Sequence, residues 1–381
     1  MSLSSLYSLK NNPFTIVPSK TNALWADRAK FKLELEEAIK FTLYSSQSQI
    51  IACIYGDWGC GKTHAMNYFS NDTVLEKIST DTGTPKDRPP LSILLIFPTK
   101  DVFKSLYLDI VYRSLVPRLE TVLNFLSKQS TFLEREGHLE AKLKGLGMND
   151  ELARILSQFT FKGKSILVGK YLSGNAARAD LDKLGVAKGI ETNGEMLSVL
   201  TDILKLFTST MHARIFIWID DCERIEEVPG REMFGFQYFL RDVLDLTPEK
   251  LTLIINFTLL PGKDVPERMT YLGPAVQSRI AKTIRVPYFD CENYLKYIED
   301  LLENSRIGTK DKVLSKYFPF NEKCLTDLFA MLEKSTSNLQ PRTVNRVLSS
   351  LLERGVREKI PLLDEKSLEK AKDEVTISMA T

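Results

Sequence analysis

The chain has 381 residues, enough for two or three domains, and 43% of them are hydrophobic, which is ample for buried cores. Its 51 basic and 49 acidic residues leave a formal net charge of +2, so any contact with nucleic acid must come from a local patch. Apolar runs such as LSILLIF and IFIWI have the length of strands, not the roughly 20 residues that span a bilayer, so we expect no membrane association.

Cysteine and histidine usage excludes several kinds of site. Five cysteines are scattered without a C-x-x-C pair, which favours a reducing compartment and argues against a disulfide or zinc framework. Three histidines are too few to favour His-based metal or triad chemistry. The first residues, MSLSSLYSLKNNPF, lack the charged-then-apolar profile of a secretion signal, so we expect a cytoplasmic protein.

The N-terminal segment, residues 1–45, begins with polar and turn-forming residues and ends in a helix. The turn region NPFTIVPSKTNALWADR covers residues 12–28. It is followed by apolar residues at helical spacing, namely Leu33, Leu35, Ala38, Ile39 and Leu43.

The stretch CIYGDWGCGKTHAMNYF, residues 53–69, satisfies the P-loop pattern G-x-x-x-x-G-K-[ST]. Glycines let successive backbone N–H groups converge on a polyphosphate, Lys62 is placed to reach the β- and γ-phosphates, and the Thr63 hydroxyl to hold Mg²⁺. A buried strand precedes the loop and a helix follows it, as ATP binding by a P-loop requires. The alternative is a Gly-rich turn that only joins a strand to a helix. The expected nucleotide-binding residues are Gly56, Asp57, Trp58, Gly59, Cys60, Gly61, Lys62, Thr63 and His64.

A second buried strand, LSILLIF, precedes a helix with one apolar face, made by Phe103, Leu106, Tyr107, Ile110 and Val111. From about 116 to 210 the pattern predicts a mostly helical insertion without an internal repeat. The insertion carries a loose basic run, for which a solvated face is the default interpretation and a DNA contact the alternative. The run consists of Lys162, Lys164, Lys170 and Arg178.

The third strand, in ARIFIWIDDCERI, ends in acids. Its apolar residues deliver Asp220 to the carboxyl edge of the sheet, where ligands bind in open α/β folds. A carboxylate at this edge can bind the magnesium shell, which makes Asp220 and Thr63 the expected metal ligands. The alternative is an ordinary strand that ends at a polar turn.

The fourth strand, LTLIINFTLL, carries Asn256 and Thr258 among apolar neighbours. A buried polar residue is costly unless it is hydrogen-bonded. Asn256 is therefore a candidate for orienting the attacking water or the γ-phosphate, and the alternative is that it caps a neighbouring loop.

Alternating strands and helices over residues 46–286 predict an α/β domain, a P-loop parallel sheet with helices on both faces. After IRVPYFD only helical patterns follow, which predicts a small all-α C-terminal lid over residues 287–360. Its helices have Asp290 as a cap, Gly308 and Gly355 as stops, and Pro341 at a first helical position. Residues 361–381 are expected to be a polar tail.

This order of motifs resembles the AAA+ ATPases, within them the initiator clade that includes origin-recognition ATPases, and the TnsC-type transposition regulators. The resemblance implies that Lys62 and Thr63 form Walker A, that Asp220 and Asp221 form Walker B, and that Asn256 is sensor 1. It also implies that the N-terminal segment and its helix lie on the adenine side of the nucleotide.

Two arginines take roles only through this resemblance. Arg279, in VQSRIAKTIRV, stands where such families present an arginine finger to the ATP of the next subunit, and Arg342, in QPRTVNRVL, matches the lid arginine called sensor 2. A surface salt bridge is the alternative for either.

Walker B departs from the usual Asp-Glu, because it reads Asp220-Asp221 with Glu223 two residues on. Aspartate is one methylene shorter than glutamate, so we expect slow hydrolysis, or a share of the role for Glu223. GDWGCGKT and IDDCER also resemble the KAP group of P-loop NTPases, whose members commonly carry membrane spans. YLSGNAARADLDKLGV is similar to a stretch of ATPases from phage-defence loci.

The leading interpretation is an ATP-binding and ATP-hydrolysing AAA+ switch that forms homo-oligomers and acts on or near DNA with other protein partners. Initiators append a winged-helix domain after the lid, and the residues after Gly355 are too few for one, which favours a recruiter or regulator. One alternative is a signalling scaffold that binds nucleotide and cycles slowly or not at all. Another is a P-loop kinase for a small molecule. Redox control through Cys60 and Cys222, beside the two motifs, is a minor alternative.

Overall fold

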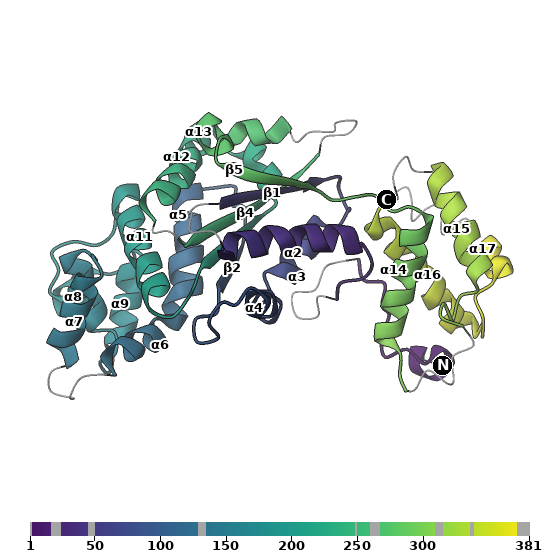
Figure 1. Cartoon of the computed structure of the whole chain (residues 1–381), viewed down its shortest axis with the longest axis horizontal. Helices are drawn as coiled ribbons and strands as arrows, with labels where there is room; N and C mark the ends of the chain where they lie inside the picture. Colours follow the sequence, from purple (N-terminus) through teal and green to yellow (C-terminus); the bar gives the residue numbers. More distant parts are fainter. Residues whose placement is uncertain are drawn as a thin grey trace. The chain divides into compact units, whose positions relative to one another are not determined.

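The structure is a computed structural model, shown in Figure 1. It describes residues 2–16, 24–44, 50–128, 135–247, 250–259, 267–308, 315–335 and 339–371. The expected N-terminal turn region, the insertion and the C-terminal tail therefore lie partly outside the described residues. The chain divides into two compact units, one made of Met1–Leu35, Tyr55–Tyr68 and Arg285–Thr381, the other of Glu36–Ile54 and Phe69–Ile284.

A five-stranded parallel sheet forms the centre of the α/β part, with strand order β2-β3-β4-β1-β5. The strands are β1 (Ile50–Gly56), β2 (Leu91–Ile96), β3 (Ile215–Asp220), β4 (Leu251–Thr258) and β5 (Ile280–Arg285). The first four confirm the strands predicted from apolar runs, and every residue of β3 and β4 is buried, as is typical of a parallel sheet covered on both faces. The predicted α/β fold class is confirmed.

The register places the ends of β3 and β4 side by side. Asp220 pairs with Ile96 on one side, and Ile219 pairs with Ile255 on the other. Since β4 lies between β3 and β1, the polar end of β4 separates the acidic end of β3 from the strand that leads into the P-loop.

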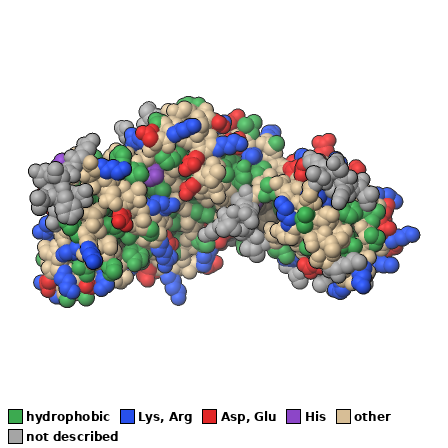
Figure 2. All heavy atoms as spheres, turned by 90° about the horizontal axis from the view of Figure 1, so that it is seen from below, with side chains coloured by type: hydrophobic (Ala, Val, Ile, Leu, Met, Phe, Trp, Pro, Cys, Tyr) green, Lys and Arg blue, Asp and Glu red, His purple; other side chains and the backbone are tan. Residues whose placement is uncertain are grey.

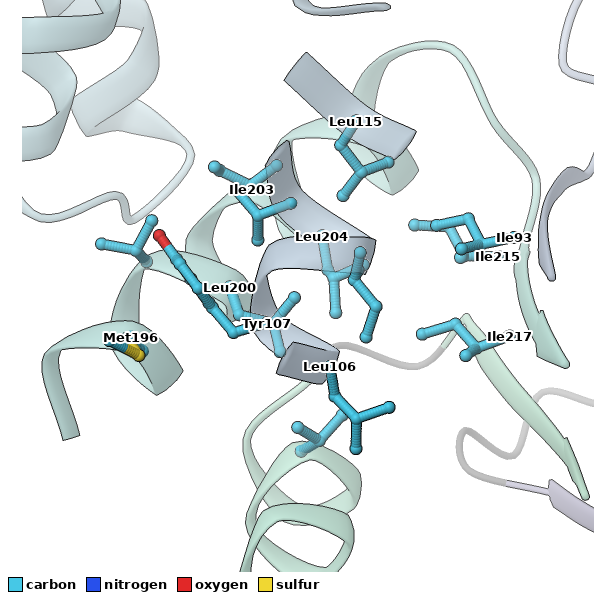
Figure 3. Packing of buried hydrophobic residues seen from close by; sticks show 14 of the residues in the cluster. Ile93, Leu106, Tyr107, Leu115, Met196, Leu200, Ile203, Leu204, Ile215 and Ile217 are labelled. Atoms are coloured by element: carbon cyan, nitrogen blue, oxygen red, sulfur yellow. The ribbon is translucent and has the colours of Figure 1, made fainter. Parts of the chain in front are cut away.

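Helices lie on both faces of the sheet (Figure 1). They include α2 (Ala29–Tyr44), α3 (Lys62–Phe69), α4 (Asp72–Asp81), α5 (Val102–Tyr107), α12 (Gly230–Leu246) and the four-residue α13 (Pro274–Gln277), with 3-10 turns η3 (Cys222–Glu227) and η4 (Glu267–Leu272). The predicted amphipathic helix after β2 is α5, continued by a π-helical segment η1 (Leu108–Leu115). Figure 3 shows its buried side chains Leu106, Tyr107 and Leu115 packed between the strands and α11 (Asn193–Thr210).

The insertion is largely helical, as its pattern predicts. Within its described residues it carries α6 (Val116–Ser127), α7 (Arg135–Gly145), α8 (Asp150–Ser157), α9 (Lys164–Leu172), α10 (Arg178–Leu184) and α11. Three members of the basic run bind partners inside the insertion. Lys164 donates to the Lys183 carbonyl, Lys170 pairs with Asp180 at 3.0 Å, and Arg178 pairs with Asp182 at 3.2 Å.

The C-terminal helices form a core of their own. They are α14 (Cys291–Ser305), α15 (Glu322–Ser335), α16 (Pro341–Glu358) and α17 (Glu365–Lys370), the last within the expected polar tail. The predicted cap is confirmed, because the Asp290 carboxylate accepts from the Asn293 N–H at 2.8 Å. Pro341 is the first residue of α16, as predicted, and α14 ends three residues ahead of Gly308.

The prediction that Gly355 ends its helix is wrong. Helix α16 runs on to Glu358 and ends at Lys359, which has φ +57°. A Cβ on Gly355 would lie 2.1 Å from the Tyr7 hydroxyl oxygen, so this glycine makes room for another part of the chain instead of stopping the helix.

Tyr7 belongs to an N-terminal stretch that packs into the helical unit. It ends α1 (Leu3–Tyr7), and its hydroxyl donates to the Ile360 carbonyl at 2.7 Å. Leu9 forms an isolated bridge with Arg306, and the Asn345 amide donates to the Thr15 carbonyl at 2.7 Å. The first residues of the chain are therefore part of the same core as the last helices.

Among the described residues, no helix combines the length and the apolar character that crossing a membrane requires. On the face shown in Figure 2, Lys and Arg side chains lie among Asp and Glu side chains. Charge on this face is mixed, as the small net charge leads one to expect.

Candidate nucleotide-binding site

The P-loop joins β1, which ends at Gly56, to α3, which begins at Lys62. Gly59 and Gly61 have φ values of +77° and +106°, which side-chain-bearing residues rarely adopt. The Cys60 N–H closes a turn on the Asp57 carbonyl at 3.3 Å. The loop therefore has the strand-turn-helix setting and the glycine conformations that a phosphate-binding loop needs.

Lys62 is buried within the loop. Its side chain is 7% exposed, and its ammonium group donates to the carbonyls of Gly56 at 3.1 Å and Asp57 at 2.9 Å. Thr63 follows as the second residue of α3 and is partly exposed. The His64 ring lies 5.9 Å from the Trp25 ring, and burial lowers the pKa of His64, so its imidazole is neutral at pH 7.

Cys60 packs against the start of the loop. A Cβ on Gly56 would lie 2.8 Å from its sulfur, so Gly56 is required for close packing as well as for the motif. Burial raises the pKa of Cys60, and burial raises that of Cys222 as well. Since the thiolate is the reactive form, both thiols are poorly suited to redox control.

The start of α16 packs directly on the P-loop. A Cβ on Gly59 would lie 2.8 Å from the Gln340 side-chain oxygen and 3.3 Å from the Arg342 Cβ. The Arg342 guanidinium lies over the exposed Trp58 ring, 5.3 Å from its centroid. Arg342, which the resemblance assigns to sensor 2, is thus in contact with two residues of the nucleotide loop.

Arg28 is a second arginine at the loop, and it is not among the site residues expected from the sequence. It donates through Nη1 to the Cys60 carbonyl at 2.5 Å, and its guanidinium lies 4.4 Å from the centre of the Phe289 ring. Burial lowers its pKa from the usual value of an arginine. No periodicity or motif distinguishes Arg28 in the sequence, because its partners are 32 and 261 positions away along the chain.

The acids predicted to form Walker B are held by the end of β4. Asp220 is 4% exposed, and the Asn256 amide donates to its carboxylate. The backbone N–H of Asp221 donates to both Asp220 and Asn256 at 3.0 Å, while Asp221 itself has φ +57°. Asn256 therefore holds the Asp220-Asp221 turn. This resembles the alternative expected for Asn256, in which it caps a neighbouring loop.

Glu223 lies near the same strand end. The Thr258 hydroxyl donates to its Oε1 at 2.5 Å, whereas Oε2 is buried without a hydrogen-bond partner among the described residues. Thr258 is the last residue of β4, so the carboxylate of Glu223 reaches the strand next to its own. Both residues are candidates from the sequence, but no spacing in the sequence predicts this contact.

Arg279 is hydrogen-bonded to residues other than these acids. It follows α13 and pairs with Asp245 at 2.7 Å, with side-chain exposures of 32% and 44%. Its Nη1 also donates to the Ala275 carbonyl. Arg279 is therefore partly exposed and forms a surface salt bridge, which is the alternative that the sequence left open for it.

The structure thus gathers the predicted residues into separate groups. In one unit the P-loop meets Arg342 and Arg28, and in the other Asp220, Asp221, Asn256 and Glu223 surround the ends of β3 and β4. Each group presents the charges that phosphoryl chemistry uses, cations and N–H groups in the first and carboxylates in the second.

Comparison with solved structures shows the fold. The ORC2 protein of Aeropyrum pernix, described in ADPNP-ADP complexes, is similar with a TM-score of 0.54 at 13% identity, over 97% of this chain and 72% of that chain. The ORC1 protein of the same organism, described in complex with DNA, has a TM-score of 0.51 at 13% identity, over 97% and 70%.

Comparison with curated proteins found no match. The model of the KAP family P-loop domain matches residues 28–257, a range that includes the P-loop, Asp220 and Asn256. Because this match covers more than half of the sequence, the chain belongs to the KAP family of P-loop NTPases.

Proposed function

We propose that this protein is an ATP-driven switch in which the helical unit responds to the nucleotide on the P-loop. The carrying observation is the packing of α16 on that loop, with Gln340 and Arg342 at Gly59 and Arg342 over Trp58. A nucleotide bound to the P-loop would contact a loop whose residues Trp58 and Gly59 also contact α16. Binding and hydrolysis would then change the set of contacts available to α16.

ATP is the proposed nucleotide and Mg²⁺ the proposed metal. The glycine conformations and the buried Lys62 ammonium suit a polyphosphate, and oxygen ligands such as the Thr63 hydroxyl and the Asp220 carboxylate suit Mg²⁺. Bound Mg²⁺ would neutralise charge on the phosphate oxygens. The chain's own part is to position the phosphates with the loop and Lys62, and to hold an attacking water with a carboxylate of the Walker B group.

The wider part of the proposal is that the protein forms homo-oligomers and acts on or near DNA. Arg279 is exposed enough to reach a neighbouring copy, which would make hydrolysis depend on assembly. The two Aeropyrum pernix proteins support an origin-recognition-like AAA+ layout, and one of them is described with DNA. In this proposal the switch acts with other proteins, in regulation or recruitment during transposition, replication or phage defence.

A scaffold that binds nucleotide without turnover is the second candidate. The observation that favours a scaffold lies at the end of β3, where Asn256 is hydrogen-bonded to both Asp220 and Asp221. Mixing the purified protein with radiolabelled ATP and Mg²⁺ separates the two. The switch releases phosphate over repeated cycles, whereas a scaffold keeps its ATP unhydrolysed for hours.

Electron microscopy of the full chain tests the wider part of the proposal. With a slowly hydrolysed ATP analogue we expect closed or helical assemblies that ADP does not support, and we expect duplex DNA to promote them. Monomers under every condition would contradict it. Phosphorylation of a small-molecule acceptor, with no assembly, would favour a kinase instead.

A further inference from the structure

Arg28 has two hydrogen-bond donors that no described residue satisfies. The residue is 8% exposed, and its Nε and Nη2 atoms are buried without a partner among the described residues, while Nη1 donates to the Cys60 carbonyl. The Nε–H and Nη2–H bonds lie parallel on one edge of the guanidinium. This edge is the fork with which arginine binds two oxygens of a carboxylate or a phosphate.

The charge of Arg28 is attracted by the neighbouring Asp27 carboxylate but is not held in a salt bridge among the described residues. Within the described parts of the chain no carboxylate forms a salt bridge with it, and its ring partner Phe289 offers only a cation–π contact. A guanidinium does not lose its proton at neutral pH, so burial leaves a cation away from water. A buried cation whose donors are not hydrogen-bonded to an acid is costly, which points to an anion that is not part of the chain.

The backbone holds this fork in place. Asp27 and Arg28 have φ values of +51° and +54°, which are uncommon for residues other than glycine. The Asp27 N–H donates to the Asp300 carboxylate at 2.9 Å, which ties the turn to α14. Strained backbone of this kind clusters at ligand sites, where it fixes a side chain before the ligand arrives.

We propose that Arg28 is a phosphate-binding residue of the nucleotide site, a role that rests on the proposed function. Its Nη1 lies 3.4 Å from the Cβ position of Gly61 and binds the carbonyl of Cys60, so the guanidinium borders the part of the loop that cradles phosphates. The Nε–Nη2 fork binds two phosphate oxygens. Guanine presents two adjacent acceptors to such a fork and adenine does not, but only the phosphate also carries the negative charge that strengthens such hydrogen bonds.

Calorimetric titration of the full chain with ATP, GTP and inorganic tripolyphosphate tests this role. Arg28→Met removes the charge and the fork, and Arg28→Lys keeps the charge but loses the fork. We expect Arg28→Met to weaken ATP and tripolyphosphate alike, by at least about tenfold for a charge-assisted pair of hydrogen bonds. Arg28→Lys should fall between this variant and the unaltered protein.

Arg214→Met is the matched control, because Arg214 is also a buried arginine, at 3% exposure, but precedes β3 at the start of the strand. It should bind ATP as the unaltered protein does. Equal affinities of Arg28→Met and the unaltered protein would overturn the proposal, and so would a loss confined to GTP, which means a base contact. If Arg28→Met does not fold, Arg28→Lys decides in the same way. An unaltered protein that binds no ATP would instead contradict the proposed function.

Discussion

Two polar residues on β4 each bind some of the acids that are predicted to form Walker B. Asn256 binds Asp220 and the backbone of Asp221, and Thr258 binds Glu223. The left-handed backbone at Asp221 suits a residue that shapes a turn, whereas one buried carboxylate oxygen of Glu223 has no hydrogen-bond partner in the described parts of the chain. We therefore predict that Glu223, rather than Asp221, holds the attacking water.

Substitution of Glu223 should therefore remove hydrolysis and spare binding. We expect Glu223→Gln to lower kcat by about 100-fold or more, as loss of a general base does, with ATP affinity unchanged. The matched control is Asp221→Asn, because asparagine also tolerates the left-handed backbone. Steady-state phosphate release measures both. The opposite ranking, with Asp221→Asn inactive and Glu223→Gln active, would contradict this assignment.

Thr258 should act through Glu223 alone. Thr258→Val removes the hydroxyl and keeps the shape, so we expect kcat to fall with little change in KM, and Thr258→Ser to restore most of it. A change in both kcat and KM that serine does not rescue would mean that Thr258 only supports the fold. Stopped-time phosphate assays at several ATP concentrations separate these results.

At the scale of elements, two helical glycines have opposite roles. Gly355 in α16 faces Tyr7, with a Cβ position 2.1 Å from its hydroxyl, whereas a Cβ on Gly235 in α12 meets nothing within 4 Å. Gly355→Ala should destabilise the protein by about 1–3 kcal/mol through overpacking. Gly235→Ala should stabilise it by about 0.5–1 kcal/mol through helix propensity. Urea unfolding measures both, and stabilisation by Gly355→Ala would show that Tyr7 is not packed there.

The elements that the sequence predicts are those with a local signal. Continuous apolar runs mark the buried strands, Asp290 marks the start of α14, and Pro341 marks the start of α16. Strand β5 is missed, because IAKTIR is half exposed and carries two basic residues, unlike the runs that predict the buried strands. Gly355 is misread because its partner, Tyr7, is far away in sequence.

The residues of the candidate site also differ in whether a local sequence signal marks them. The P-loop and the Walker B acids are visible as spacings, whereas the contacts of Arg28 and of Thr258 depend on tertiary packing that no spacing encodes. The resemblance supplied Arg342, and its position over Trp58 is the detail that only the structure gives.

At the scale of the whole molecule, the P-loop belongs to the unit of the C-terminal helices. That unit is assembled from three separate stretches of the chain, so its composition cannot be read from the sequence in order. The N-terminal residues contribute to the same core through Tyr7, Leu9 and Phe14. A ligand on the P-loop can therefore affect the helical unit through contacts within one compact body.

Assembly should set the rate of hydrolysis. Surface salt bridges contribute about 0–1 kcal/mol, so Arg279 can leave Asp245 for a phosphate of a neighbouring copy at little cost. We expect turnover per subunit to rise with protein concentration, and Arg279→Ala to abolish that rise without weakening ATP binding. Asp245→Asn removes the salt bridge but keeps the arginine, and should retain the rise. A rise that persists in Arg279→Ala would contradict the role.

The most direct test is the affinity of Lys62→Ala for ATP, measured by equilibrium titration beside the unaltered protein. Lys77→Ala, an exposed lysine on α4, serves as the control. A buried ammonium that binds phosphate predicts a loss of about 10- to 100-fold for Lys62→Ala and none for the control. Equal affinities for all three proteins would contradict the nucleotide site itself.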